Sequence, residues 1–344
     1  MNAQEKDKSP LVSVAVTTFN YGNYIADAIA SVLAQTYRNL EIIIRDDCSP
    51  PPDKTAEIVA GFKDSRIRFT RNSKNIGLFV NLNTVLRECK GEYIKILCAD
   101  DRLKPTCIEE MVKASRSFPE AGQIFSNYCA INGSGKLMAL VKKNIGRHSS
   151  AFEPLYFTGK ESQKIFYFHG CVWGNLSSGM IKRDILQTVG FFPENSFQTG
   201  DFEYLIKISN KFGMVYVPKP LAEIRWHESS ASSRNANAGK SVSEFYELME
   251  LFPVLAKGFK VGRINEFIQK GKIDENFFWE TLLALLRKKR RDVAKEILSQ
   301  ILKYGSVSRG MVFFTIRFPR RLARLILKLY LKSSGKPWIY YGES

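Results

Sequence analysis

The sequence predicts an α/β fold in which helices flank a mostly parallel sheet. Short apolar runs rich in β-branched residues indicate buried strands, and segments with helical periodicity lie between them. The expected strands are residues 11–16, 40–44, 67–70 and 93–98. The expected helices are residues 25–33, 54–62 and 79–89. Strands that alternate with helices form right-handed βαβ units, and such units build a parallel sheet.

The later part of the chain predicts a different organisation. Short strands and helices continue to about residue 234, and from residue 235 the pattern becomes wholly helical, with no further strand expected. We therefore expect a polar leader at residues 1–10, an α/β domain at residues 11–234 and a helical region at residues 235–344. A length of 344 residues suits about two such units.

Basic residues are concentrated in the last part of the chain. The net charge is +17, and residues 284–344 hold 15 Lys and Arg against three Asp and Glu. Such a segment favours an anionic surface, either a membrane or a nucleic acid. Six cysteines without a CxxC pair favour a reduced, cytoplasmic chain. The leader has no apolar stretch of signal-peptide type, and no run approaches the ~18 apolar residues needed to cross a bilayer.

Residues 319–332 predict a basic amphipathic helix. Pro319 suits the first turn of a helix, where its missing N–H is not needed. Basic and apolar side chains recur at helical spacing, namely Arg320, Arg324, Lys328 and Lys332, and Leu322, Leu325, Ile326 and Leu329. Helices of this type lie in the headgroup plane of anionic membranes, so we expect a peripheral protein on the inner face of the cell membrane. The alternative is a helix docked on the protein's own core.

Polar clusters follow three of the expected strands. Thr17 follows the first strand, Asp46-Asp47 the second and Asp100-Asp101 the last. In such sheets, ligands bind beyond the carboxyl ends of the strands. Paired carboxylates there suit Mn²⁺ or Mg²⁺, which takes one or two protein carboxylates together with phosphate oxygens and water. Two alternatives stay open: Asp101 begins a helix, and Asp46-Asp47 forms a turn rather than binding a base or ribose.

These segments resemble family-2 glycosyltransferases. The resemblance covers about residues 10–230, and its elements occur in the family's order and spacing, ending on Ala99-Asp100-Asp101. The preceding elements are Val12–Asn20, Ser31–Tyr37, Glu41–Ser49, Asn75–Gly77 and Gly91–Ile94. The resemblance implies a GT-A, Rossmann-like fold, with a nucleotide-sugar-binding half at residues 11–117 and an acceptor half at residues 118–234.

The resemblance also implies an activity. An inverting glycosyltransferase moves a sugar from a UDP-, dTDP- or GDP-sugar to a hydroxyl group of the acceptor, with Mn²⁺ or Mg²⁺ as cofactor. The implied acceptor is a glycan or a lipid-linked glycan of cell-surface polysaccharide synthesis. If the acceptor is bound to a membrane, the basic C-terminal helix would hold the enzyme at the same surface.

The resemblance assigns roles to individual residues. The implied nucleotide-sugar contacts are Thr17, Asn20, Asp46, Asp47, Asn81 and Asp100. Asp101 resembles the direct metal ligand, and His227 resembles a late histidine near the diphosphate that sometimes binds the metal. Asp201 resembles the carboxylate that acts as general base on the acceptor hydroxyl. The alternatives are an N-cap role for Asp201 and a structural role for His227.

Two departures from the family pattern affect this site. Cys98 stands where many relatives carry Asp, two positions before Asp100, so we expect the cation to rely on phosphate and water for most of its ligands. Many relatives carry Ala-Arg-Asn where this chain reads Asn81-Leu82-Asn83. An arginine that reaches the nucleotide is therefore missing, and Asn81 substitutes for it only in part. These departures leave the base preference open.

Two other functions compete with sugar transfer. A sugar-phosphate nucleotidyltransferase also uses a strand-end carboxylate and a metal, but it usually opens with a Gly-rich phosphate loop, which residues 17–23 lack. A nucleic-acid-binding protein would explain the basic tail. It would not explain the ordered carboxylate clusters, because acidic strand ends repel phosphate unless a metal bridges them. We therefore expect no nucleic-acid partner.

Overall fold

The computed structural model divides into two compact units. It describes residues 9–143, 145, 153–196, 198–227, 230, 240–286, 291–317 and 338–341. The first unit comprises residues 1–195, 200–225 and 339–344, and the second comprises residues 196–199 and 226–338. The basic helix expected at residues 319–332 lies outside the described residues. No helix within the described ranges is both long and apolar enough to cross a membrane.

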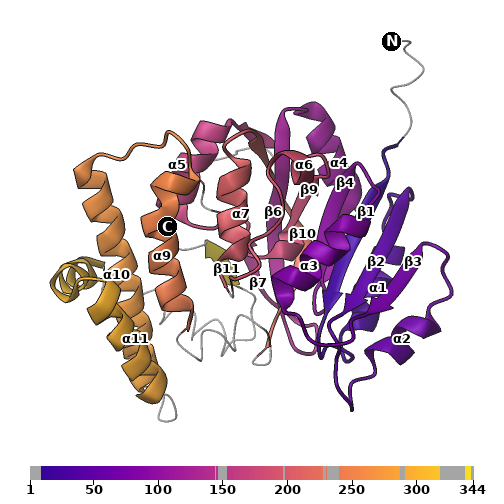
Figure 1. Cartoon of the computed structure of the whole chain (residues 1–344), viewed down its shortest axis with the longest axis horizontal. Coiled ribbons are helices and arrows are strands. Elements are labelled where there is room, and N and C mark those ends of the chain that lie inside the picture. Colours follow the sequence, from indigo (N-terminus) through magenta and orange to yellow (C-terminus); the bar gives the residue numbers. More distant parts are fainter. Residues whose placement is uncertain are drawn as a thin grey trace. The chain divides into compact units, whose positions relative to one another are not determined.

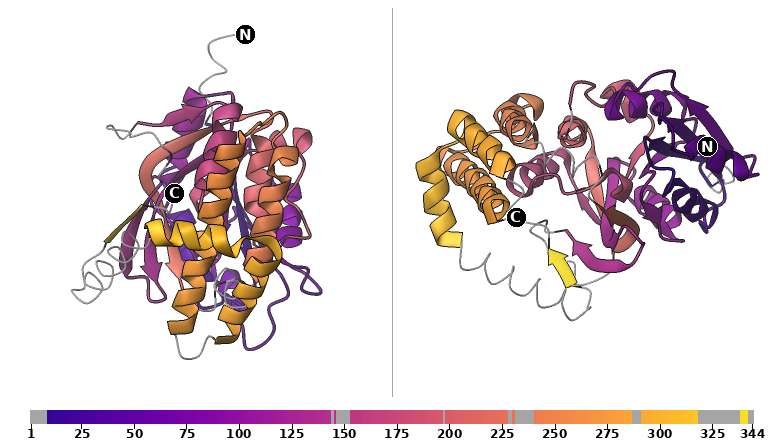
Figure 2. Two further views of the ribbon diagram at one scale, coloured as in Figure 1. Left: turned by 90° about the vertical axis from the view of Figure 1, so that its left-hand side faces the viewer. Right: turned by 90° about the horizontal axis from the view of Figure 1, so that it is seen from below.

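The first unit is organised around an 11-stranded mixed sheet (Figure 1). Its strands are β1 (Val12–Thr18), β2 (Leu40–Asp46), β3 (Ile67–Arg71), β4 (Tyr93–Cys98), β5 (Arg102–Leu103), β6 (Ala121–Asn132), β7 (Leu137–Lys142), β8 (Leu155–Phe157), β9 (Gly179–Lys182), β10 (Gly213–Trp226) and β11 (Trp338–Tyr341). The main order is β11-β7-β6-β9-β4-β1-β2-β3, and β10 pairs with β5, β6 and β8. Helices flank the sheet (Figure 2).

The sheet has a parallel half and an antiparallel half. β3, β2, β1 and β4 pair in parallel. The next strands, β9, β6 and β7, pair antiparallel. The parallel half is therefore the part that the alternating βαβ pattern predicts, and the predicted α/β fold with flanking helices is confirmed.

The helices of the first unit connect these strands. They are α1 (Ile25–Leu33), α2 (Thr55–Gly61), α3 (Leu78–Glu88), α4 (Cys107–Ser117), α5 (Gly159–His169), the 3₁₀ turn η2 (Leu176–Ser178), α6 (Ile185–Thr188) and α7 (Gly200–Ile208). On α1, the buried side chains recur at helical spacing, namely Ile25, Ala28, Ile29 and Val32. One apolar face of this helix thus packs inward, as its sequence pattern predicts.

A buried lysine fixes the end of β4 that leads into the expected metal motif. Lys95 is fully buried, and its ammonium group donates hydrogen bonds to the carbonyl oxygens of Ser177 (2.6 Å), Gly179 (2.9 Å) and Ile96 (3.0 Å). Burial lowers the pKa of this lysine. The hydroxyl of Ser177 also accepts a hydrogen bond from the Cys98 N–H (2.8 Å). β4 is therefore tied to η2 and β9 just before the motif begins.

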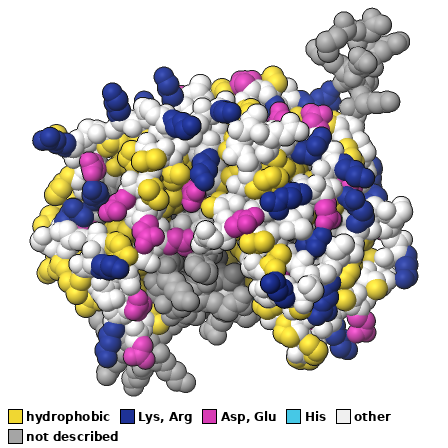
Figure 3. All heavy atoms as spheres, viewed as in Figure 1, with side chains coloured by type: hydrophobic (Ala, Val, Ile, Leu, Met, Phe, Trp, Pro, Cys, Tyr) yellow, Lys and Arg dark blue, Asp and Glu magenta, His cyan; other side chains and the backbone are white. Residues whose placement is uncertain are grey.

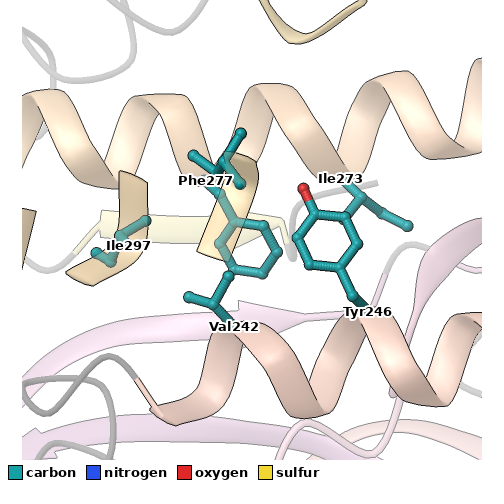
Figure 4. Packing of buried hydrophobic residues seen from close by; sticks show 6 residues of the cluster. Val242, Tyr246, Ile273, Phe277 and Ile297 are labelled. Atoms are coloured by element: carbon teal, nitrogen blue, oxygen red, sulfur yellow. The ribbon is translucent and has the colours of Figure 1, made fainter. Parts of the chain in front are cut away.

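The second unit is helical. Its helices are α9 (Lys240–Leu255), α10 (Arg263–Leu286), α11 (Arg291–Tyr304) and a further segment at residues 307–317. Figure 4 shows the core between them, which comprises Val242, Tyr246, Ile273, Phe277, Ile297 and Ile301. The Phe313 ring packs so closely against Gly271 of α10 that a side chain at this position would collide with it.

Two buried carboxylates of α10 bind the last helical segment. Asp274 accepts hydrogen bonds from the Tyr246 hydroxyl (2.6 Å) and from Nε of Arg309 (2.7 Å). Glu275, the next residue, pairs with Arg317 at 3.1 Å. Buried charges are costly unless they are paired, so these arginines are structural partners of α10.

The expectation of no strand beyond residue 235 is wrong. β11 (Trp338–Tyr341) joins the edge of the sheet next to β7. The run Trp-Ile-Tyr-Tyr has high β propensity, but four residues form a strand only where another strand offers free backbone groups. That partner lies almost two hundred residues earlier, at residues 137–142.

The helical core leads to a test with a matched pair of residues. Ile301 and Leu302 are neighbours on α11, but Ile301 is fully buried and Leu302 is 65% exposed. We expect Ile301→Ala to lower the free energy of unfolding by about 2–5 kcal/mol, because it leaves a cavity. Leu302→Ala should change it by less than about 0.5 kcal/mol. Urea unfolding followed by circular dichroism measures both values, and equal losses would contradict this core.

Candidate active site

The carboxyl ends of the parallel strands bring the predicted clusters to one edge of the sheet. Thr17 on β1 is the strand partner of Cys98 on β4, and Thr18 is the partner of Asp46 on β2. Asp100 and Asp101 follow β4 directly. The structure thus places the ends of three strands side by side, at the edge where ligands bind in sheets of this kind.

Cys98, Asp100 and Asp101 form a compact group of metal-ligating side chains. One ligand atom from each of the three lies within 4.8 Å of the others. Asp101 is 1% exposed and Asp100 is 7% exposed. No other group of three or more His, Cys, Asp or Glu side chains among the described residues is close enough to share an ion.

The two oxygens of the Asp101 carboxylate have different surroundings. Oδ1 accepts a hydrogen bond from the backbone N–H of Arg225 (2.8 Å). Oδ2 is buried and accepts no hydrogen bond from the described residues. Burial, together with the negative charge of Asp100, raises the pKa of Asp101 well above its usual range. Ser177 and Arg225 offset this rise only in part, and Oδ2 itself has no hydrogen-bond donor among the described residues.

The alternative in which Asp101 begins a helix is wrong. The two residues after it form β5 (Arg102–Leu103), which pairs with β10, and α4 begins only at Cys107. Asp101 instead closes a tight turn, since its N–H donates to the Cys98 carbonyl oxygen (3.0 Å). The carboxylate is thus positioned by strand pairing on both sides of the turn.

Arg225 is a site residue that the sequence analysis did not identify. Besides the backbone contact to Asp101, its Nε donates to the Asp100 carbonyl oxygen (2.8 Å). Its other guanidinium nitrogens donate to the carbonyl oxygen of Gly133 (2.9 Å) and to the carboxylate of Asp27 (2.9 Å). The side chain is buried and lies over the Tyr24 ring. The sequence does not single out Arg225, because Lys219 and Glu223 are charged residues of the same strand.

The donor set fits a divalent cation. Two carboxylates at the end of a strand supply hard oxygen ligands, and a cation would give the unpartnered Oδ2 of Asp101 its missing partner. It would also offset the repulsion between the two adjacent carboxylates. Cys98, which the sequence analysis treated as a loss of a ligand, places a sulfur atom in the same group.

The carboxylates of Asp46 and Asp47 already accept hydrogen bonds, Asp46 from its own loop and Asp47 from the loop before α3. Asp46 is fully buried and accepts from the hydroxyl (2.5 Å) and the N–H (3.1 Å) of Ser49. Asp47 accepts from the N–H groups of Ile76 and Gly77, both at 2.9 Å. The contacts of Asp46 are those of a turn, and the binding of a base or ribose by these carboxylates stays a prediction. The contacts of Asp47 join the end of β2 to the loop that precedes α3.

The remaining residues predicted to bind the nucleotide-sugar lie along the same edge. Asn81, in the first turns of α3, accepts from the side-chain amide of Asn72 (2.9 Å), which also donates to Asp47 (2.9 Å). Thr17 is buried at the end of β1. Asn20 is exposed, with a positive φ of 60°, and its N–H donates to the Ser49 hydroxyl. This hydrogen bond joins the loop after β1 to the loop after β2.

Asp201 lies in the first turn of α7. The helix begins at Gly200, so Asp201 is inside the helix rather than at its N-cap. Its Oδ1 accepts from the N–H of Phe202 (2.7 Å). Burial, with the charge of Asp201 as a further cause, raises the pKa of Cys171. Glu203 pairs with Lys207 one turn later (2.5 Å).

A lysine that the sequence gave no reason to select lies close to this region. Burial lowers the pKa of Lys143 to about 7. Its ammonium group donates to the carbonyl oxygen of Trp173 (2.5 Å) and lies 4.5 Å from the centre of the Tyr128 ring. The thiol of Cys171 also influences Lys143. Lys143, Cys171 and Asp201 therefore belong to one neighbourhood of titratable groups.

His227 follows β10 in the second unit and is partly buried. Its carbonyl oxygen accepts from the N–H of Ser230 (3.2 Å). Within the described residues, the metal-ligating group contains neither His227 nor Asp201. The metal role of His227 stays a prediction.

Relatives of this chain are known from their sequences. The chain is 26% identical over 230 residues to an uncharacterized glycosyltransferase of Rickettsia typhi, a match that covers 67% of this chain and 68% of the relative. It is 29% identical over 226 residues to one of Methanocaldococcus jannaschii, covering 64% and 72%. A related protein of Rickettsia felis is longer, and the match spans 36% of it.

Solved glycosyltransferase structures share the fold. Residues 1–349 of S. aureus TarS, in complex with UDP-GlcNAc, superpose with a TM-score of 0.55 at 16% identity, covering 86% of this chain and 74% of that fragment. The mannosyltransferase PcManGT of Pyrobaculum calidifontis, in complex with GDP-Man and Mn²⁺, gives a TM-score of 0.53 at 15% identity, covering 96% and 87%. Residues 13–182 match the model of "Glycosyl transferase family 2". Residues 13–182 of this chain therefore belong to glycosyl transferase family 2, and the chain has the GT-A fold that its motifs led us to expect.

Proposed function

We propose that this protein is a metal-dependent, inverting glycosyltransferase that moves a sugar from a nucleotide-sugar to a hydroxyl acceptor. The observation that carries the proposal is the buried, unpartnered Oδ2 of Asp101 beside the Asp100 carboxylate. Without a cation at this position, two adjacent buried carboxylates repel each other, and Oδ2 of Asp101 has no hydrogen-bond donor among the described residues. Family membership supports the transfer reaction, and this carboxylate pair supports its dependence on metal.

The proposed donor is a UDP-, dTDP- or GDP-sugar, and the proposed cation is Mn²⁺ or Mg²⁺. TarS binds UDP-GlcNAc, and PcManGT binds GDP-Man with Mn²⁺. In the proposal, the nucleotide lies along the edge formed by the ends of β1, β2 and β4. Its contacts there are Thr17, Asn20, Asp46, Asp47, Asn81 and Asp100.

In the proposed mechanism, Asp101 and Asp100 hold the cation, and Arg225 fixes their orientation. When bound, the cation neutralises the charge of the departing diphosphate. Arg225 donates to Oδ1 of Asp101 through its backbone and to the Asp100 carbonyl oxygen through its side chain, so Oδ2 stays directed away from these donors. Such preorganisation means that the carboxylate does not have to reorient during the reaction.

Asp201 is the proposed general base. Its carboxylate accepts the proton of the acceptor hydroxyl as the hydroxyl oxygen attacks the anomeric carbon and the bond to the diphosphate breaks. The position of Asp201 in the first turn of α7 supports this role, because the helix N-terminus stabilises the carboxylate before the transfer. The neighbourhood of Lys143 and Cys171 then belongs to the acceptor side.

The proposed acceptor is a glycan or lipid-linked glycan at an anionic membrane, in the synthesis of cell-surface polysaccharide. Lys and Arg side chains are spread over the face shown in Figure 3 rather than gathered in one stripe. The basic stripe at residues 319–332 therefore carries this part of the proposal. The segment just before it supports a surface role, because Met311, Val312 and Ile316 are each more than half exposed.

The metal site is tested by Asp101→Asn. We expect metal-stimulated hydrolysis of the donor sugar to fall by about 100-fold or more, because the variant loses the charge that binds the cation. The melting temperature should stay the same or rise, since a neutral amide removes a buried repulsion with Asp100. Hydrolysis is measured with UDP-, dTDP- and GDP-sugars in Mn²⁺ or Mg²⁺.

The matched control for this variant is Asp64→Asn. Asp64 pairs with Arg66 in the loop before β3, far along the chain from the strand-end cluster. This control should keep full hydrolysis. Full activity of Asp101→Asn would remove Asp101 from the proposed site, and a large fall in its melting temperature would indicate a structural role instead.

The general base is tested by comparing Asp201→Asn with Glu203→Gln. We expect Asp201→Asn to lower turnover by about 10²–10⁴-fold, because no carboxylate then takes the proton from the attacking hydroxyl group. Donor affinity, measured by titration calorimetry, should be unchanged. Glu203→Gln changes a carboxylate two residues away that is already paired with Lys207, and it should keep normal turnover. Turnover that persists in Asp201→Asn rules out this base.

Membrane binding is tested by changing four basic residues of the predicted helix, Arg320, Arg324, Lys328 and Lys332, to glutamine. Each charge near an anionic surface contributes roughly 1 kcal/mol, so binding to phosphatidylserine vesicles should weaken by at least about 100-fold. The control changes four exposed lysines among the described residues of the second unit, Lys257, Lys260, Lys295 and Lys303. Equal binding by the two variants would refute a role specific to residues 319–332.

A further inference from the structure

Cys98 places a thiol within the candidate metal site. It is the last residue of β4, and its Sγ belongs to the group of ligand atoms that lie within 4.8 Å of one another. Two ligands on opposite sides of one cation are about 4.5 Å apart, from typical metal–sulfur and metal–oxygen distances of ~2.3 and ~2.1 Å. The sulfur and the two carboxylates are therefore close enough to share an ion after small side-chain rotations.

The backbone around Cys98 holds the thiol at this position. Its N–H donates to the Ser177 hydroxyl (2.8 Å), and its strand partner on β1 is Thr17. Lys95, three residues earlier, ties the same strand to η2 and β9. The thiol is thus fixed at the carboxyl edge of the sheet, on the strand that also delivers the two carboxylates.

A second, independent observation points to a ligand at this position. Asp101 is almost fully buried, and its Oδ2 accepts no hydrogen bond from the described residues. A cation held by Cys98, Asp100 and Asp101 would give this oxygen a partner. The other cysteines in the described residues belong to no such group with two carboxylates.

We propose that Cys98 is a direct ligand of the divalent cation and gives the site a preference for Mn²⁺ and softer ions over Mg²⁺. This inference rests on the proposed function, because it requires a cation at Asp100 and Asp101. Mg²⁺ binds almost wholly through oxygen, whereas thiolate ligands favour softer transition metals. The thiol releases its proton to solvent as the sulfur–metal bond forms, since the thiolate is the binding species.

The proposal is tested on the full-length protein with Co²⁺ in the presence of UDP or GDP. A thiolate bound to Co²⁺ gives a sulfur-to-metal charge-transfer absorption in the near ultraviolet, whereas oxygen ligands alone do not. We expect this absorption in the unmodified protein and its loss in both Cys98→Ser and Cys98→Asp. Cys129→Ser changes another partly exposed cysteine and should keep the absorption. Circular dichroism confirms that the variants are folded.

Metal affinities give a second readout that does not depend on activity. By titration calorimetry, Cys98→Ser should weaken Cd²⁺ binding by at least about 10-fold, since even residues that only support metal ligands contribute that much. Cys98→Asp should raise the affinity for Mg²⁺ relative to that for Cd²⁺, because it makes the protein ligands all oxygen.

The outcomes separate this inference from the proposed function. If Co²⁺ binds in a way that Asp101→Asn abolishes, but without the charge-transfer absorption, then Cys98 is not a ligand and only the present inference fails. The same conclusion follows if Cys98→Ser leaves both the absorption and the Cd²⁺ affinity unchanged. If no Asp101-dependent binding of Co²⁺ or Cd²⁺ occurs with UDP or GDP, then the proposed metal site fails, and the role of Cys98 fails with it.

Discussion

The contact between Arg225 and the turn after β4 holds the candidate site together. Asp101 is buried, and a buried carboxylate is costly unless donors or positive charge compensate for it. Arg225 supplies that compensation on one side, through its backbone N–H to Oδ1 and its guanidinium group to the carbonyl oxygen of Asp100. The same guanidinium group binds Gly133 and Asp27. A single side chain on β10 thus connects α1, the end of β4 and the turn after β6.

The carboxylates at the carboxyl edge of the parallel strands have two different roles. Asp46 and Asp47 lie at this edge, but their oxygens accept hydrogen bonds from nearby loops, and they shape the surface on which a nucleotide would lie. Asp101 lies at the same edge and keeps one buried oxygen without a partner. Buried polar groups are usually satisfied, so this oxygen distinguishes Asp101 from Asp46 and Asp47, and it lies at the position proposed for the cation.

The helical unit uses its charges differently. Asp274 and Glu275 are buried and paired with Arg309 and Arg317, so these groups stabilise the packing of helices rather than a ligand. The apolar side chains of residues 307–317 divide between an inner face that packs on α10 and an outer face that is exposed. The proposal of a membrane surface therefore depends on the exposed apolar face and on the basic residues that follow it in the sequence.

The sequence by itself determined the parallel half of the sheet, its helices to within about two residues and the family, because these features depend on local periodicity and on motifs of contiguous residues. It also placed Asp101 at the end of β4. Only the tertiary structure decided which carboxylate keeps an unpartnered oxygen, since Asp46 and Asp47 are satisfied by loops that no local pattern brings near. Arg225 and β11 could not be predicted for a related reason. Arg225 lies 124 residues from Asp101, and β11 exists through its pairing with β7. Both depend on contacts that form only when distant segments pack together.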